Sequence, residues 1–133
     1  MQEPRTILVV DRNPRIRDFV KRELLSDGHR VLTAENTEAL RRCIARPERL
    51  DALVIDPNMP GLDGVGSLER LLLSRPALPV VFHCQICDRQ GLVERPHQWV
   101  FVEKTGQSVD AVRRQVLRLL GLAVDAESRT TDT

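Results

Sequence analysis

The chain has no tyrosine, only three cysteines, and no apolar run near the roughly 20 residues that a membrane-spanning helix requires. Three cysteines are too few, and odd in number, for a disulfide framework. The net charge of +1 gives no general attraction to nucleic acid or to an anionic membrane. Residues 1–6 lack the pattern of a signal peptide. We therefore expect a cytoplasmic globular protein that contacts neither nucleic acid directly nor a membrane.

Apolar residues are present in short runs that alternate with helical patterns. The runs are continuous rather than alternating in polarity, which is typical of strands covered on both faces of a parallel sheet. Asparagine, proline and glycine residues bound the helical patterns. Strands are expected at residues 7–10, 31–32, 53–55, 80–82 and 100–102, and helices near residues 14–27, 36–46, 67–76 and 108–121, with a short or frayed helix within residues 85–98.

This alternation predicts an α/β fold. We expect a doubly wound, five-stranded parallel sheet with the flavodoxin-like order 2-1-3-4-5 and about five helices on both faces. One domain over residues 1–122 accounts for the pattern, and the polar residues 123–133 are expected to form a flexible C-terminal tail. Ligands of such folds bind at the carboxyl ends of the strands.

Charged residues follow three of the expected strands. Asp11 follows the first, Asp56 the third, and Lys104 the fifth; Lys104 is one of only two lysines in a chain with 20 lysine and arginine residues. With the order 2-1-3-4-5, the two carboxylates lie together and the lysine faces them. A carboxylate can accept a phosphoryl group, and phosphoryl transfer usually needs Mg²⁺ and a lysine to neutralise the phosphoryl oxygens. These parts therefore suit phosphoryl chemistry.

Three stretches carry a family resemblance. The segments "ILVVDRNPRIRDFVKRELLSDGHRVLTAENTEAL", "DALVIDPNMPGLDG" and "VFVEK" resemble the receiver domain of bacterial two-component response regulators, over residues 5 to about 121. The D-x-x-M-P-G-x-D-G block at residues 56–64 is its most specific part. The resemblance implies a signalling phosphoacceptor domain rather than an enzyme.

The resemblance also implies roles for particular residues. Asp56 would be the phosphoacceptor, and Lys104 would contact the phosphoryl group. Mg²⁺ would be held by Asp11, by Asp56 and by the backbone carbonyl of Asn58. Cys84 lies where the family has a threonine or serine that bonds a phosphoryl oxygen, although a thiol is only a weak donor.

Several positions depart from the family pattern. Arg12 replaces the second acid of the pair that begins with Asp11, and Thr105 replaces the proline after Lys104, so that a trans peptide bond is expected there. Two alternatives follow for Arg12. Its guanidinium could extend to Asp56, occupy the place of the metal and weaken Mg²⁺ binding; or it could point to solvent and leave Asp11 and Asp56 to bind the metal.

The leading functional hypothesis is signal relay. A histidine kinase or phosphotransfer protein would transfer a phosphoryl group to Asp56. A downstream effector or a second copy of the chain would read the change through the family's helix 4, strand 5 and helix 5. The alternative is a pseudo-receiver, a protein-interaction module that works without phosphorylation. An aspartyl-phosphate hydrolase is disfavoured because residues 11–13 read Asp-Arg-Asn rather than D-x-D.

Other features have plainer interpretations. Cys84 and Cys87 form a C-x-x-C near His83 and His97, which could bind zinc or exchange thiols, but a single such motif is a weak signal. Phe101 matches the aromatic switch position of the family, but a core residue is the better interpretation of it. Because the chain has no tyrosine, the tyrosine hydroxyl that usually reports the switch is absent. The arginines of the last helix are most simply a solvated face, and they could also help form the family's surface for dimers and partners: Arg113, Arg114 and Arg118.

Overall fold

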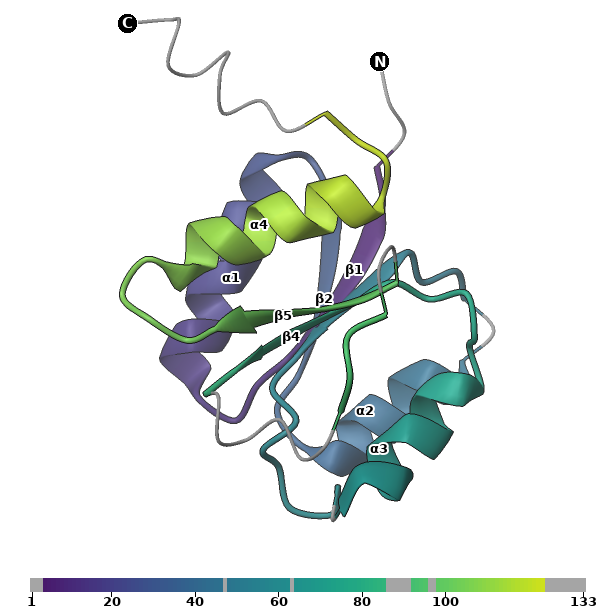
Figure 1. The fold of residues 1–133 in the computed structure, drawn as a ribbon. Helices are drawn as coiled ribbons and strands as arrows, with labels where there is room; N and C mark the ends of the chain where they lie inside the picture. The colour runs from purple at the N-terminus through teal and green to yellow at the C-terminus, as the bar shows by residue number, and fades with distance from the viewer. Residues whose placement is uncertain (1–3, 47, 63, 86–91, 96–97, 124–133) are drawn as a thin grey trace, which may run out of the picture.

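The computed structural model describes residues 4–46, 48–62, 64–85, 92–95 and 98–123. It contains one five-stranded parallel sheet with the order β2-β1-β3-β4-β5, which confirms the predicted fold class (Figure 1). The elements are β1 (Thr6–Val10), α1 (Pro14–Ser26), β2 (Arg30–Ala34), α2 (Thr37–Ala45), β3 (Ala52–Ile55), α3 (Gly64–Leu73), β4 (Val80–Cys84), β5 (Trp99–Glu103) and α4 (Ser108–Leu119).

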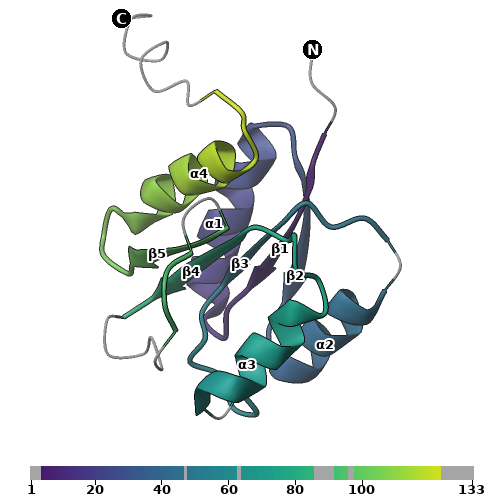
Figure 2. The same ribbon diagram turned by 45° about the vertical axis from the view of Figure 1, so that its right-hand side comes forward.

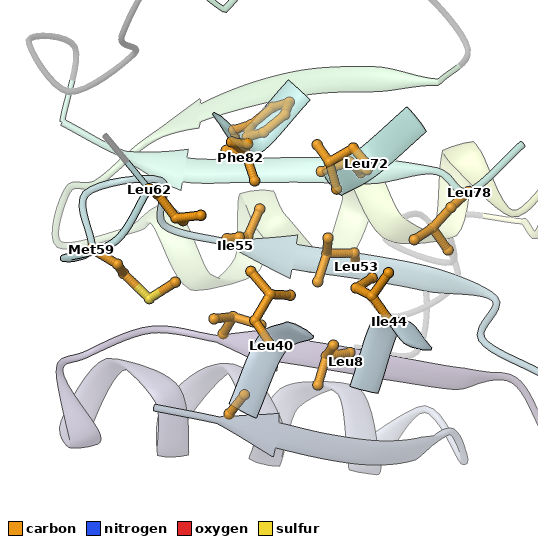
Figure 3. Close-up of a cluster of buried hydrophobic side chains, with 14 of the residues drawn as sticks. Leu8, Leu40, Ile44, Leu53, Ile55, Met59, Leu62, Leu72, Leu78 and Phe82 are labelled. Carbon is orange, nitrogen blue, oxygen red and sulfur yellow. The ribbon is translucent and has the colours of Figure 1, made fainter. Parts of the chain in front are cut away.

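Helices cover both faces of the sheet. Helices α1 and α4 lie together on one face, and α2 and α3 lie on the other (Figures 1 and 2). Neighbouring residues of a strand point to opposite faces, so Ile7 packs with the α1/α4 layer and Leu8 with the α2/α3 layer. In Figure 3, Leu40 and Ile44 of α2 point toward Leu53 and the other strand residues of this second layer. The continuous apolar runs of the sequence have this double burial as their cause.

The helix starts follow the predicted capping chemistry. The Asn13 side chain accepts hydrogen bonds from the amides of Arg15 and Ile16, with Pro14 at the first helical position of α1. The Asn36 side chain caps α2 in the same way. These caps place the start of each helix directly after the loop at the carboxyl end of the preceding strand.

The connection between β4 and β5 lies only partly within the described residues. Residues 86–91 and 96–97 lie outside the described part, so the predicted helix is not tested there; residues 92–95 are not helical. Arg95 instead pairs with Trp99 in an antiparallel bridge, and the Glu94 carboxylate accepts a hydrogen bond from the amide of Phe101. The described residues therefore contain four helices, and this segment runs along the outer edge of β5.

Two further expectations concern the whole chain. The predicted tail lies almost entirely in residues 124–133, outside the described part, so the division of the chain at residue 122 stays a prediction. Among the described residues, every helix is too short or too polar to span a membrane.

Candidate functional site

Three charged side chains meet at the carboxyl end of the sheet. Asp11 follows β1, Asp56 follows β3, and Lys104 follows β5. The Lys104 Nζ lies 2.9 Å from Asp11 Oδ2 and 2.5 Å from Asp56 Oδ2. All three side chains are largely buried, with 5–12% of their surface exposed. The structure therefore brings together the three residues that the sequence placed at this edge.

The other carboxylate oxygens are bound by the backbone. Asp11 Oδ1 accepts a hydrogen bond from the amide of Asn13 at 2.9 Å, and Asp56 Oδ1 accepts one from the amide of Asn58 at 2.8 Å. Burial, the largest influence, lowers the pKa of Lys104, but its hydrogen bonds to Asp56 and Asp11 and their charges together raise that pKa above its usual value. Lys104 is thus a firmly charged ammonium between two oriented carboxylates.

Arg12 takes no part in this arrangement. Its side chain is exposed, and within the described residues it forms no ion pair with Asp11 or Asp56. The exposed position of Arg12 agrees with the second alternative, and Lys104 lies between the carboxylates instead; metal binding by Asp11 and Asp56 stays a prediction. A different arginine contacts this strand end: Arg17 of α1 donates from Nη1 to the carbonyl oxygen of Asp11 at 2.7 Å. No sequence motif distinguished Arg17 from its neighbours.

The donor set fits a hard divalent cation only in part. Asp11, Asp56 and the backbone of Asn58 supply oxygen, which Mg²⁺ prefers, and Mg²⁺ retains several waters in such sites. Two carboxylates and one lysine leave one net negative charge. A cation must compete with the Lys104 ammonium for Asp11 Oδ2 and Asp56 Oδ2. The residues present can hold Mg²⁺, in competition with their own lysine.

The loop after β3 is tied to the start of α2. The hydroxyl of Thr37 donates to the carbonyl oxygen of Pro60 at 2.5 Å. Gly61 has φ +88°, and a Cβ at Gly61 would lie 3.4 Å from the Thr37 side chain. Met59 of this loop is buried in the core (Figure 3). These contacts hold the loop next to Asp56.

Cys84 and Phe101 are both packed against neighbours. Cys84 ends β4 and is 2% exposed, and its carbonyl oxygen accepts a hydrogen bond from the amide of Lys104 at 2.9 Å. The Phe101 ring stacks on Phe82 with centroids 4.8 Å apart. Phe101 is half-buried at the edge of the core, as its core interpretation requires. The partner thiol Cys87 and the imidazole of His97 lie outside the described residues.

His83 is the site residue whose role the sequence did not indicate. It is 2% exposed, and its Nε2 lies 2.8 Å from Ser108 Oγ at the start of α4. Ser108 Oγ also donates to the Thr105 carbonyl oxygen at 2.8 Å and accepts from the Thr105 amide at 3.1 Å. Since the single hydroxyl hydrogen is used on Thr105, the Nε2–H of His83 donates to Ser108. A polar residue in an otherwise apolar strand was the available signal.

The His83 network fixes the turn that follows Lys104. Burial, and next the nearby Lys104 charge, lower the pKa of His83 to about 4, so the imidazole is neutral at pH 7. The Lys104–Thr105 peptide bond is trans, as expected.

The described residues contain no group of three or more potential metal-binding side chains, and His83 is engaged with Ser108.

Comparisons with known proteins agree with this geometry. The response regulator receiver domain family matches residues 7–94. The chain is 34% identical over 80 residues to the probable transcriptional regulatory protein TcrX of Mycobacterium tuberculosis, covering 59% of this chain and 33% of that protein. It is 30% identical over 95 residues to the DNA-binding transcriptional regulator NtrC of Escherichia coli, covering 71% of this chain and 20% of that protein. The alignments thus span a third or less of these two relatives.

Solved structures show the same fold. The response regulator protein TrrA of Thermotoga maritima, in complex with Mg²⁺ and BeF, is 26% identical with a TM-score of 0.70, covering 86% of this chain and 98% of that chain. A response regulator receiver domain protein of Clostridium thermocellum is 23% identical with a TM-score of 0.69, covering 88% and 94%. Because the family matches well over half of the chain, including Asp11 and Asp56, the chain belongs to the response regulator receiver domains of two-component systems.

Proposed function

We propose that Asp56 accepts a phosphoryl group from a phosphohistidine of a histidine kinase or phosphotransfer protein. An oxygen of Asp56 forms a bond to phosphorus while the bond from phosphorus to the histidine nitrogen breaks. The electron pair of the broken bond stays on that nitrogen of the partner's imidazole ring. The observation that supports this most directly is the position of Asp56, oriented by the Asn58 amide and paired with Lys104 at the carboxyl end of the sheet. Lys104 then neutralises charge on the phosphoryl oxygens.

Asp11 contributes the second carboxylate of the site. Together with Asp56 and the Asn58 carbonyl, it would hold Mg²⁺, which when bound would neutralise phosphoryl oxygens and orient them. The Asn13 amide fixes Asp11 Oδ1, so that Oδ2 faces Lys104. Cys84, the buried last residue of β4, would contact a phosphoryl oxygen through its thiol, which is a weaker donor than a hydroxyl.

A surface at the β5 edge is the proposed route of output. It consists of residues 92–95, β5 and α4. Arg95 joins it to α3 through an ion pair with Glu69 at 3.4 Å, and the Arg95 guanidinium lies 4.1 Å from the centre of the Trp99 ring. Val93 is 72% exposed beside them. A downstream effector or a second copy of the chain would contact this surface.

One observation favours the alternative function of a pseudo-receiver. In the unmodified chain, Lys104 already satisfies both carboxylates, so the site is compact without a phosphoryl group. An interaction module that works without phosphorylation would need only this arrangement and the surface at the β5 edge.

Acetyl phosphate labelling separates the two functions. Incubation with acetyl phosphate and Mg²⁺, followed by intact-mass measurement, should show addition of one phosphoryl group. Asp56→Asn should abolish it, whereas Asp18→Asn, which changes an exposed carboxylate on α1, should not. Absence of the adduct, under conditions that label a typical receiver, would leave the pseudo-receiver as the function.

A further inference from the structure

A cavity of about 980 Å³ lies at the amino ends of β1, β2 and β3, the opposite end of the sheet from Asp56. Its size is at the upper end of the range of about 300–1,000 Å³ for sites that bind small molecules. Its lining includes Arg5, Arg30, Leu32, Cys43, Arg46 and Arg49. The receiver chemistry at Asp56 makes no use of this cavity.

The cavity is rich in cations that lack acidic partners. Within the described residues, the side chains of Arg5, Arg30 and Arg46 form no ion pair or side-chain hydrogen bond. Of the arginines in the lining, Arg49 is the one with a partner, since its Nε lies 2.8 Å from Asp51 Oδ1. The lining holds four arginines against two acids, Glu48 and Asp51, and this excess of positive charge in a concave site attracts anions.

Part of the wall is held by a separate arginine. Arg75, which follows α3, donates from Nε to the Ile44 carbonyl oxygen at 3.0 Å and from Nη1 to the Glu48 carbonyl oxygen at 3.4 Å, and it also bonds the Arg46 carbonyl oxygen. Asp51 Oδ2 accepts a hydrogen bond from the amide of the first residue of β1 at 2.8 Å. These bonds fix the backbone around the cavity, so a ligand would not have to order it.

The floor of the cavity is apolar. Leu32 is 38% exposed although it lies in a strand, and Cys43 and Leu50 line the cavity with it. Arg30 lies two residues before Leu32 and therefore on the same face of β2. Guanidinium groups bind phosphate through paired hydrogen bonds and stack on flat rings, and an apolar floor suits a ring as well.

We propose that this cavity binds a small phosphorylated molecule with a flat ring system, the chemistry of a nucleotide. The arginines would bind the phosphate, and the ring would cover Leu32 and Leu50. Binding would occur at the end of the sheet opposite the phosphoacceptor, and it does not depend on phosphorylation of Asp56.

The test is calorimetric titration of the whole chain with adenosine and guanosine monophosphates, adenosine and inorganic pyrophosphate. At least one monophosphate should bind, and adenosine and pyrophosphate should each bind at least tenfold more weakly. Arg30→Ala combined with Arg46→Ala should weaken nucleotide binding at least tenfold. The control combines Arg22→Ala with Arg114→Ala, which removes the same charge from the exposed surfaces of α1 and α4 and should leave binding unchanged.

A second measurement tests whether the nucleotide occupies this cavity. The bound nucleotide should slow alkylation of Cys43 by N-ethylmaleimide, measured on the Cys43 peptide by mass spectrometry. Asp56→Asn should bind nucleotide as the native chain does, so this result is independent of the relay. The proposal is overturned if neither monophosphate binds, if the two variant pairs lose affinity equally, or if adenosine or pyrophosphate binds as tightly as the monophosphates.

Discussion

Lys104 is the residue on which the charge balance of the phosphoacceptor site depends. Its ammonium contacts one oxygen of each carboxylate, and the backbone amides of Asn13 and Asn58 bind the others. The chain itself therefore balances part of the negative charge of the site, through the lysine that follows β5. Arg12, the residue that replaces a family acid, lies at the surface and changes the site by the carboxylate it removes rather than by the guanidinium it adds.

Replacement of Lys104 should separate metal binding from phosphorylation. In Lys104→Met the two carboxylates face each other without a cation, so Mg²⁺ affinity should rise about tenfold, which corresponds to about 1.4 kcal/mol. The rate of labelling by acetyl phosphate should fall by at least about tenfold, because charge on the phosphoryl oxygens loses its partner. Lys21→Met changes the other lysine, on α1, and is the control. Unchanged Mg²⁺ affinity in Lys104→Met would contradict the competition.

His83 should make folding stability depend on pH. Because burial lowers its pKa from 6.5 to about 4, the unfolded chain binds more protons between these values, and stability falls as pH decreases through 6.5. From about pH 7.5 to pH 5 the loss should be about 2 kcal/mol. Urea unfolding at both values measures it. The pKa of His29 is also lowered, so His29 adds to the pH dependence. The contribution of His83 is the difference in pH dependence between the native chain and His83→Gln. An equal loss in both would contradict the assignment.

At the scale of elements, α4 is joined to α1 by a buried ion pair. Arg113 is 1% exposed, and its Nε and Nη2 lie 2.7 and 3.1 Å from the Asp27 carboxylate at the end of α1. The interpretation of all three helix arginines as a solvated face was therefore wrong for Arg113. It lies next to Val112 and Val116 on the inner face, where its long side chain crosses the core layer to the end of the neighbouring helix.

Removing this pair should be costly. Arg113→Ala should lower the free energy of unfolding by about 3 kcal/mol or more, because Asp27 is left largely buried without its cation. Arg114→Ala removes the neighbouring arginine, which is half exposed and paired with Asp110, and should change stability by no more than about 0.5 kcal/mol. Chemical unfolding of both variants measures the contrast. Similar losses of stability in the two variants would show that Arg113 contributes no more than a surface charge.

The described end of the connection between β4 and β5, residues 92–95, covers part of the outer edge of β5. Residues 92–95 supply an antiparallel bridge at Trp99 and a carboxylate for the amide of Phe101, both on the outer side of β5. Since an edge strand exposes unpaired backbone groups, this segment covers the edge without a helix. The surface proposed for output is accordingly built from a strand, an extended segment and one helix.

At the scale of the molecule, the sheet separates two apolar layers, and each end of the sheet carries one of the two proposed sites. The carboxyl ends of the strands hold Asp11, Asp56 and Lys104, and the amino ends hold the arginine-lined cavity. Both ends depend on the same central strands. Leu53 of β3 has no exposed surface and packs between α2 and the neighbouring strands (Figure 3).

Truncation at the centre should weaken the whole molecule. Leu53→Ala should lower the free energy of unfolding by about 2–5 kcal/mol, because a cavity remains where the side chain packed. Leu73→Ala, at the 48% exposed end of α3, should change it by about 0.5 kcal/mol. Thermal unfolding of the two variants gives the comparison. An equal loss of stability in Leu73→Ala and Leu53→Ala would contradict the central position of Leu53 in the core.

The sequence by itself determined the strand runs, the Asn13 cap and the family, because these depend on double burial, local propensity and a specific motif. It also placed Asp11, Asp56 and Lys104 at one edge, since parallel strands end together. Only the tertiary structure decided which cation lies between the carboxylates, and that His83 contacts Ser108 and Arg113 contacts Asp27. Those contacts join residues from 25 to 93 positions apart, as in His83 with Ser108 and Lys104 with Asp11. The direction of side chains across packed layers leaves no periodic pattern in the sequence.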